Sequence, residues 1–195
     1  MKDLITSILM LVVFTLVLGV GYPFAVWGVA QLAFPSQANG SLIVKDGKVV
    51  GSALIGQNFT SEQYFHGRPS AAGTGYDAAS SSGSNLGPTN RKLIERIQSD
   101  TETLAAENPG KPIPADLVTT SASGLDPHIS PAAAEFQVPS VAKARGMSES
   151  EVRQLVVKFT EGRQLGFLGE SRVNVLLLNL SLDELDTRHT SLVTH

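Results

Sequence analysis

The sequence predicts an α+β protein in which one N-terminal transmembrane helix is followed by a single domain with a small sheet and several short helices. Residues 4–44 carry no charge, and most of residues 4–34 are apolar. The rest of the chain alternates helix-period apolar patterns with short apolar runs and turn signals, and it contains no internal repeat. We therefore divide the chain into an anchor at residues 1–35 and a domain at residues 36–195.

The predicted span covers residues 4–33. About 20 apolar residues in a helix cross the roughly 30 Å hydrocarbon core of a bilayer. Gly21 and Pro23 predict a kink or a helix end near residue 21, because proline lacks a backbone donor and clashes one turn back. Trp27 and Phe34 suit the membrane–water boundary.

A cleaved signal peptide is the alternative for this segment. Lys2 supplies a positive start, and Gly28-Val29-Ala30 resembles a small-residue cleavage site. An ordinary signal core spans only about 7–15 residues, whereas the apolar stretch here continues to Phe34. The length favours a retained anchor.

Composition excludes several classes of protein. The net charge is −3 and no basic run occurs, so nucleic acid is excluded as a partner. The absence of cysteine excludes a lipoprotein anchor, a disulfide scaffold and a thiolate zinc site. Basic residues flank the span on both sides almost equally, but the two residues before it cannot form a domain. We therefore expect the domain to be exported, on the periplasmic or extracellular side.

The domain is predicted to begin with a hairpin and an irregular segment. Asp46-Gly47 separates two apolar runs within residues 41–55, which is a strong hairpin signal. Residues 56–90 are rich in Gly, Ser, Ala and Asn with a few large side chains, and we expect an ordered irregular segment. Disorder of residues 71–82 is the alternative.

The later elements follow from caps and breakers. Asn90 and Pro109 bound a predicted helix over residues 91–108, and Ser148 with Glu151 predicts a capping box. Pro139 is expected to separate two short helices. The remaining predictions are a helix from 131 to before 139, a helix over 139–145, a helix over 148–161, a buried strand over 173–178 and a short helix over 181–188.

Two sets of polar side chains contain the residue types found in metal sites and in hydrolase active sites. The four histidines (His66, His128, His189 and His195) show no spacing that places two ligands on one helical face, so no metal site is expected. Ser123, Asp126 and His128 contain the residue types of a serine hydrolase but lack the Gly-x-Ser-x-Gly elbow. Such crowding is more typical of a turn. An anchored hydrolase remains the alternative function.

Several motifs, taken in order, resemble the C-subunit family (KdpC) of the bacterial Kdp potassium-transporting P-type ATPase. The motifs are residues 37–41 (QANGS), 51–59 (GSALIGQNF), 64–70 (YFHGRPS), 83–86 (GSNL), 121–126 (SASGLD), 137–139 (QVP), 141–145 (VAKAR), 173–175 (VNV) and 178–180 (LNL). The resemblance covers nearly the whole chain, including the anchor.

The resemblance implies a place in a potassium pump. The family's complex has a channel-like A subunit that selects potassium, a B subunit that hydrolyses ATP through a phosphorylated aspartate, a small F peptide and the single-span C subunit. It implies no cofactor in this chain, with ATP, Mg and potassium handled by the partner subunits in the bacterial inner membrane. It also implies a non-catalytic accessory subunit that stabilises the assembly and caps the outer potassium entry. A binding or scaffold module unrelated to transport is a further possibility.

The surface expected to contact partners combines polar loops with aromatic side chains. An equal alternative is that its glycines and aromatics serve only the fold. The expected residues are Gln57, Asn58, Phe59, Tyr64, Phe65, His66, Arg68, Pro69, Ser84, Asn85 and Leu86.

Overall fold

The computed structural model describes the backbone of residues 1–193 and the side chains of residues 1–185, and it confirms the α+β class. The chain forms two compact units, Met1–Ser52 and Ala53–His195, which are treated separately. The first contains α1 (Lys2–Phe14), the π-helix η1 (Thr15–Gly21), α2 (Tyr22–Ala33), α3 (Pro35–Ala38), β1 (Leu42–Lys45) and β2 (Lys48–Ser52). The second contains α4 (Arg91–Glu107), the 3₁₀ turn η2 (Ala115–Leu117), β3 (His128–Ile129), α5 (Pro131–Arg145), α6 (Glu149–Lys158), β4 (Thr160–Glu161), β5 (Arg172–Asn174) and α7 (Val175–Val193).

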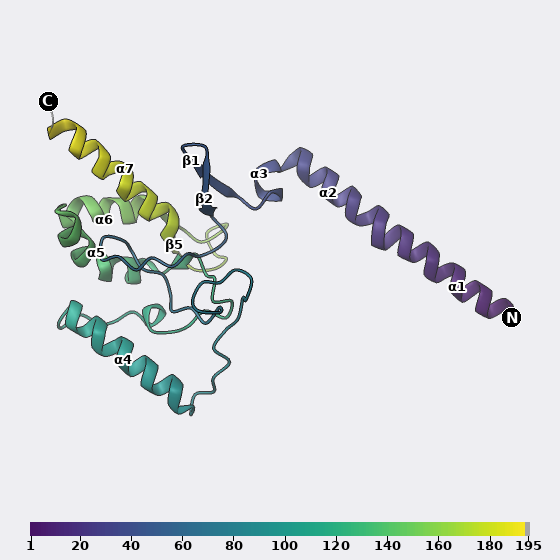
Figure 1. Ribbon diagram of the computed structural model, residues 1–195, viewed down its shortest axis with the longest axis horizontal. Helices are drawn as coiled ribbons and strands as arrows, with labels where there is room; N and C mark the ends of the chain where they lie inside the picture. Colours follow the sequence, from purple (N-terminus) through teal and green to yellow (C-terminus); the bar gives the residue numbers. More distant parts are fainter. Residues whose placement is uncertain (194–195) are drawn as a thin grey trace. The chain divides into compact units, whose positions relative to one another are not determined.

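One helical stretch of the described residues, Lys2–Ala33, is long and apolar enough to cross a membrane. It has 32 residues, a mean hydropathy of 2.6 and no buried residue in its apolar window. The helix does not end near residue 21 but passes through π-helical η1, and Figure 1 draws α1 to α2 as one ribbon. There the Tyr22 N–H bonds the Val17 carbonyl, five residues back. The π-helical turns directly precede Pro23, which has no N–H to donate.

The predicted hairpin is confirmed in the first unit. Strands β1 and β2 pair antiparallel with a register shift between Ile43 and Val44. Asp46 and Gly47 have φ angles of 51° and 74°, the left-handed values that this two-residue turn requires.

The core of the second unit lies between a small antiparallel sheet and three helices. The strand order is β3-β5-β4. Helices α5 and α6 pack against each other, and α7 packs against α6, as Figure 1 shows. Their apolar faces form one cluster with Phe65 and Leu117. The fully buried members with the largest side chains are Phe65, Leu178, Leu182, Val138, Val141, Val152 and Val173.

Two predicted helices are confirmed with their caps. The Asn90 side chain accepts a hydrogen bond from the Lys92 N–H at the start of α4. Ser148 and Glu151 form the reciprocal capping box that begins α6. Helix α6 ends at Lys158, three residues before the predicted end.

The predicted break at Pro139 is wrong. Helix α5 is continuous from Pro131 to Arg145, with Pro139 inside it. Proline in a helix interior costs about 3 kcal/mol. Here the helix buries Phe136, Val138 and Val141 on both sides of the proline, and this burial outweighs the lost hydrogen bond.

The predicted strand over residues 173–178 is only partly correct, and the predicted terminal helix is too short. The strand β5 stops at Asn174, and α7 runs for 19 residues from Val175. The Asn174 side chain accepts a hydrogen bond from the Leu177 N–H and so caps the helix. A short apolar run fits a buried strand or a buried helix equally well, and the cap decides between them.

Candidate partner-binding surface

The irregular segment before α4 is held in place by side chains from distant helices. Phe65 is fully buried, and its peptide group is bound by Asn179 of α7, which is 1% exposed. The Asn179 oxygen accepts from the Phe65 N–H at 2.9 Å, and the Asn179 Nδ2 donates to the Phe65 carbonyl at 2.9 Å. One buried amide thus satisfies both polar groups of a residue that belongs to no strand.

The next residue is held in the same manner from another helix. The Gln137 Oε1 of α5 accepts from the His66 N–H at 2.8 Å, and its Nε2 donates to the His66 carbonyl at 3.1 Å. Two amides from α5 and α7 therefore fix two consecutive residues, and the His66 ring remains exposed.

A charged cluster fixes the segment just before Phe65. The Arg145 Nη2 lies 2.8 Å from the Asp183 carboxylate, and its Nε donates to the Gln63 carbonyl at 2.6 Å. The Tyr64 hydroxyl donates to Asp183 at 3.2 Å. Burial and the Asp183 charge raise the pKa of Tyr64, against the lowering effect of Arg145. Tyr64 therefore stays a neutral donor at physiological pH.

A second polar cluster lies at the other end of the segment. Arg68 forms an ion pair with Asp126 at 3.2 Å, and the Tyr76 hydroxyl donates to the Arg68 carbonyl at 2.7 Å. Burial would raise the pKa of Asp126, but hydrogen bonds from His128 and Arg68 outweigh burial and lower it. Burial, with the Asp126 charge, raises the pKa of Tyr76 to about 12.

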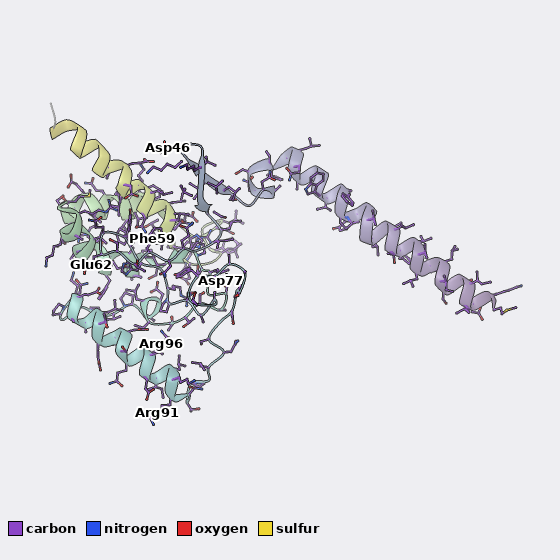
Figure 2. The ribbon with its side chains drawn as sticks, in the orientation of Figure 1. Asp46, Phe59, Glu62, Asp77, Arg91 and Arg96 are labelled. Carbon is purple, nitrogen blue, oxygen red and sulfur yellow. The ribbon has the colours of Figure 1, made fainter. Side chains whose placement is uncertain are left out.

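The segment borders a hollow of about 410 Å³ in the second unit. The hollow brings together five of the predicted residues, namely Asn58, Phe59, His66, Arg68 and Pro69. Its other wall includes Asp100, Thr103, Leu104 and Glu107 of α4. Arg96 points from α4 toward the rest of the domain and bonds the Val118 carbonyl, and Figure 2 labels it with Phe59.

A neighbouring hollow of about 500 Å³ includes Tyr64 and shares His66, Glu107 and Gln137 with the first. The segment and two helices thus form a continuous, indented surface lined by both polar and apolar side chains. The aromatic rings of Phe59 and Tyr64, 5.4 Å apart, lie side by side in it.

The other predicted residues lie elsewhere. Phe65 is in the core, so its side chain is not available to a partner in this conformation. Gln57 lines neither hollow, and the segment Ser84, Asn85 and Leu86 lies outside both. Asn85 is exposed with a φ of 51°, and the chain just before it is tied to Ser123 by the Ser82 N–H at 3.0 Å.

The residues of the hydrolase alternative do not form a nucleophile and base. Ser123 Oγ accepts from the Leu125 N–H, and the nearest Asp126 oxygen is 3.7 Å from His128 Nδ1. Among the side chains described, no hydrogen bond joins Ser123 to His128. The Asp126 side chain instead accepts from the His128 backbone N–H, as in an Asx turn.

Within residues 1–185, no three His, Asp or Glu side chains are grouped so that they could hold a metal ion. The side chains of His189 and His195 lie outside the described residues. His66 contacts the Ser61 carbonyl, and His128 faces Asp126. Both rings have local protein partners.

Sequence reasoning assigned no role to the residues that hold this surface in place. Gln137, Asn179 and Arg145 are separated from the segment by more than 70 positions along the chain. The available signal was a polar residue inside an apolar helical run, as in residues 176–180 (LLLNL). Buried polar groups are almost always hydrogen-bonded, so a polar residue in such a run predicts a hydrogen bond to another part of the chain.

Comparisons with known proteins give one consistent family. Residues 4–184 match the family model described as KdpC, the K⁺-transporting ATPase c chain. The chain is 61% identical to the potassium-transporting ATPase KdpC subunit of Koribacter versatilis over 182 residues, 93% of this chain and 94% of that protein. The KdpC subunits of Bradyrhizobium diazoefficiens and Caulobacter vibrioides are 55% and 64% identical, covering 94% and 87% of this chain and 97% and 87% of theirs.

Proposed function

Because the chain belongs to the KdpC family of K⁺-transporting ATPase c chains, a subunit family of a potassium transporter, we propose that it is the pump's non-catalytic assembly subunit. It joins the channel-like A subunit, the ATP-hydrolysing B subunit and the small F subunit, and it caps the outer potassium entry. ATP, Mg and potassium are handled by those partners. The anchor is residues 1–35, and residues 36–195 form the domain that contacts them.

The observation that carries the proposal is the rigid hold on residues 64–66. Asn179 and Gln137 fix the backbone, while His66, Asn58 and parts of Phe59 and Tyr64 remain accessible. A surface already fixed in its bound conformation loses little conformational entropy when a partner binds. Exposed polar and aromatic side chains that are already held in place are typical of a protein-binding surface, which fits a subunit that binds partners and does not itself catalyse a reaction.

A charged substitution tests this surface. N58R places a long cation at an exposed position that borders the hollow, where the Asn58 side chain makes no hydrogen bond to any of the described side chains or backbone. We expect at least a tenfold lower recovery of the ATPase subunits with the tagged chain, because an unmatched charge at an interface costs about 1.4 kcal/mol or more. The matched control is Q98R, at an exposed position of α4 that lines neither hollow. Equal recovery with both variants would remove this surface from the proposal.

The candidate span is proposed to be a tether in the bacterial inner membrane. Tethering raises the local concentration of the domain near its partners, so even a modest contact persists. A chain lacking residues 1–35 should dissociate from the pump and fail to support growth at limiting potassium. Normal growth with the truncated chain would contradict the role of the tether.

The domain is proposed to lie on the outer, periplasmic side. The chain contains no cysteine, so A105C on the exposed surface of α4 gives one reactive thiol. A membrane-impermeant maleimide should label it in intact cells whose outer membrane has been made permeable. Labelling only after lysis of the inner membrane would place the domain in the cytoplasm.

Co-purification separates the proposal from an anchored scaffold unrelated to transport. The tagged full-length chain should recover a protein with the phosphorylated aspartate of a P-type ATPase. Stable recovery of other partners, with no ATPase subunit among them, would support the unrelated scaffold.

A further inference from the structure

The hairpin loop between β4 and β5 projects large apolar side chains into solvent. All of residues 161–170 are exposed, and Leu165, Phe167 and Leu168 are 83%, 70% and 47% exposed. Reciprocal backbone hydrogen bonds of 2.9 Å between Gln164 and Leu168 close the tip. The apolar side chains therefore stand on a defined turn.

The backbone at this tip conflicts with the residue that occupies it. Leu165 has a φ of 52° and Gly166 a φ of 82°. Glycine adopts such angles freely, whereas a bulky residue is strained there, and Asn or Gly would suit the turn better. Leu165 has no core contact to compensate, since most of its side chain is exposed. A strained apolar residue at an exposed position indicates a requirement from outside the fold.

The stem of the loop carries charges that cancel. Arg163 pairs with Glu170 at 3.3 Å, and Arg172 pairs with Glu161 at 2.9 Å. Attachment to a lipid surface grows with buried apolar area and with attraction of basic residues to anionic lipids. This stem offers no net positive charge. An apolar centre that includes an aromatic ring, within a polar rim, is instead the composition of a protein interface.

We propose that the tip formed by Leu165, Phe167 and Leu168 inserts into an apolar cleft of a partner subunit of the ATPase. The proposal rests on the proposed function, because membership in a subunit family of this ATPase is what supplies the partner. The tip is a contact distinct from the hollow beside His66, whose lining contains none of these residues. The paired stem charges form the polar rim around it.

Thiol protection tests the occupant directly. L165C and F167C each place one thiol on the tip of a chain that has no other cysteine, and I94C on α4, where Ile94 is 52% exposed, is the control. In lipid vesicles containing the full-length chain alone, a maleimide should label all three at similar rates. In the assembled pump, labelling at 165 and 167 should slow at least about tenfold while I94C is unchanged. Denaturing gels separate this chain from the thiols of the other subunits.

Two results would overturn the proposal. Unchanged labelling in the assembled pump means that no subunit covers the tip. Protection already present in vesicles without partner subunits means that lipid, and not protein, is the occupant.

L165N separates binding from folding. Asparagine tolerates left-handed angles, so the urea midpoint of the chain should be unchanged or higher. Recovery of the ATPase subunits should fall about tenfold because an apolar anchor is lost. I94N is the matched control, and full recovery with L165N would contradict the proposal. If even the wild-type chain recovers no ATPase subunit, the proposed function fails as well.

Discussion

The guanidinium carbon of Arg145 lies 4.8 Å from the centre of the Tyr64 ring, while the Arg145 side chain is only 2% exposed. The planar cation therefore stacks on an aromatic face and at the same time binds Asp183 and the Gln63 carbonyl. This single side chain, at the end of α5, connects α7 to the irregular segment that enters the candidate surface.

Removal of Arg145 should be strongly destabilising. R145A removes the buried cation that pairs with Asp183 and deprives the Gln63 carbonyl of a donor, so we expect a loss of about 3 kcal/mol in the free energy of unfolding. Urea unfolding of the full-length chain measures it. R153A is the matched control, because Arg153 is a partly exposed arginine whose ion pairs with Glu135 and Glu149 are open to solvent, so its removal should cost much less. Equal losses in the two variants would contradict the structural role of Arg145.

Truncation of Asn179 should release the segment it holds. N179A leaves the buried N–H and carbonyl of Phe65 without partners, and we expect a loss of about 2–3 kcal/mol. Hydrogen exchange should show faster exchange of the Phe65 and His66 amides than in the wild type. N58A, at an exposed position, should leave both quantities unchanged. Retained protection of the Phe65 amide in N179A would be the contrary result.

Stability should fall in acid partly through Asp126. The pKa of its carboxyl is lower in the folded chain than its ordinary value of 3.8, so the folded state binds fewer protons than the unfolded state near that pH. The stabilisation is present above the unfolded pKa and is lost as the pH falls through the folded pKa. The difference in unfolding free energy between wild type and D126N should therefore be larger at pH 7 than at about pH 3. An equal difference at both values would show that the charge of Asp126 contributes nothing.

Two prolines of α5 should respond in opposite directions. P139A restores an N–H that can bond the Glu135 carbonyl inside the helix, and we expect a gain of about 1 kcal/mol. P131A, at the first turn, removes no strain and only increases the freedom of the unfolded chain, for a loss of about 0.5–1 kcal/mol. Urea unfolding checks both. A loss in P139A would mean that the neighbouring core depends on the proline ring.

Patterns that depend on near neighbours were predictable. The Asp46-Gly47 turn, the Asn90 cap and the Ser148–Glu151 box each act over two to four residues, and each was confirmed. At Pro139, packing outweighed local preference, and α5 continues through the proline. After Asn174, the apolar run fitted a strand and a helix equally well, and the Asn174 cap that decides for α7 is a local signal that the prediction did not use.

The candidate surface shows the same division. Polar loops with aromatic residues pointed to Asn58, Phe59, His66, Arg68 and Pro69, and these residues do line one hollow. The sequence could not show which of the predicted residues are exposed and which are buried. Phe65 and His66 are adjacent in the chain, yet Phe65 is buried and His66 is exposed. That difference depends on Asn179 and Gln137, which the chain brings back from far along the sequence.

By itself the sequence determined the apolar N-terminal helix, the α+β class, the hairpin, the helix caps and the family, because each is written in local composition, spacing or a linear series of motifs. Only the tertiary structure decided which groups hold the irregular segment and which face solvent, including the strained leucine at the tip of the β4–β5 loop. Hydrogen bonds between residues far apart in the sequence, and the burial of side chains, depend on how the chain folds back on itself. No local sequence pattern contains that information.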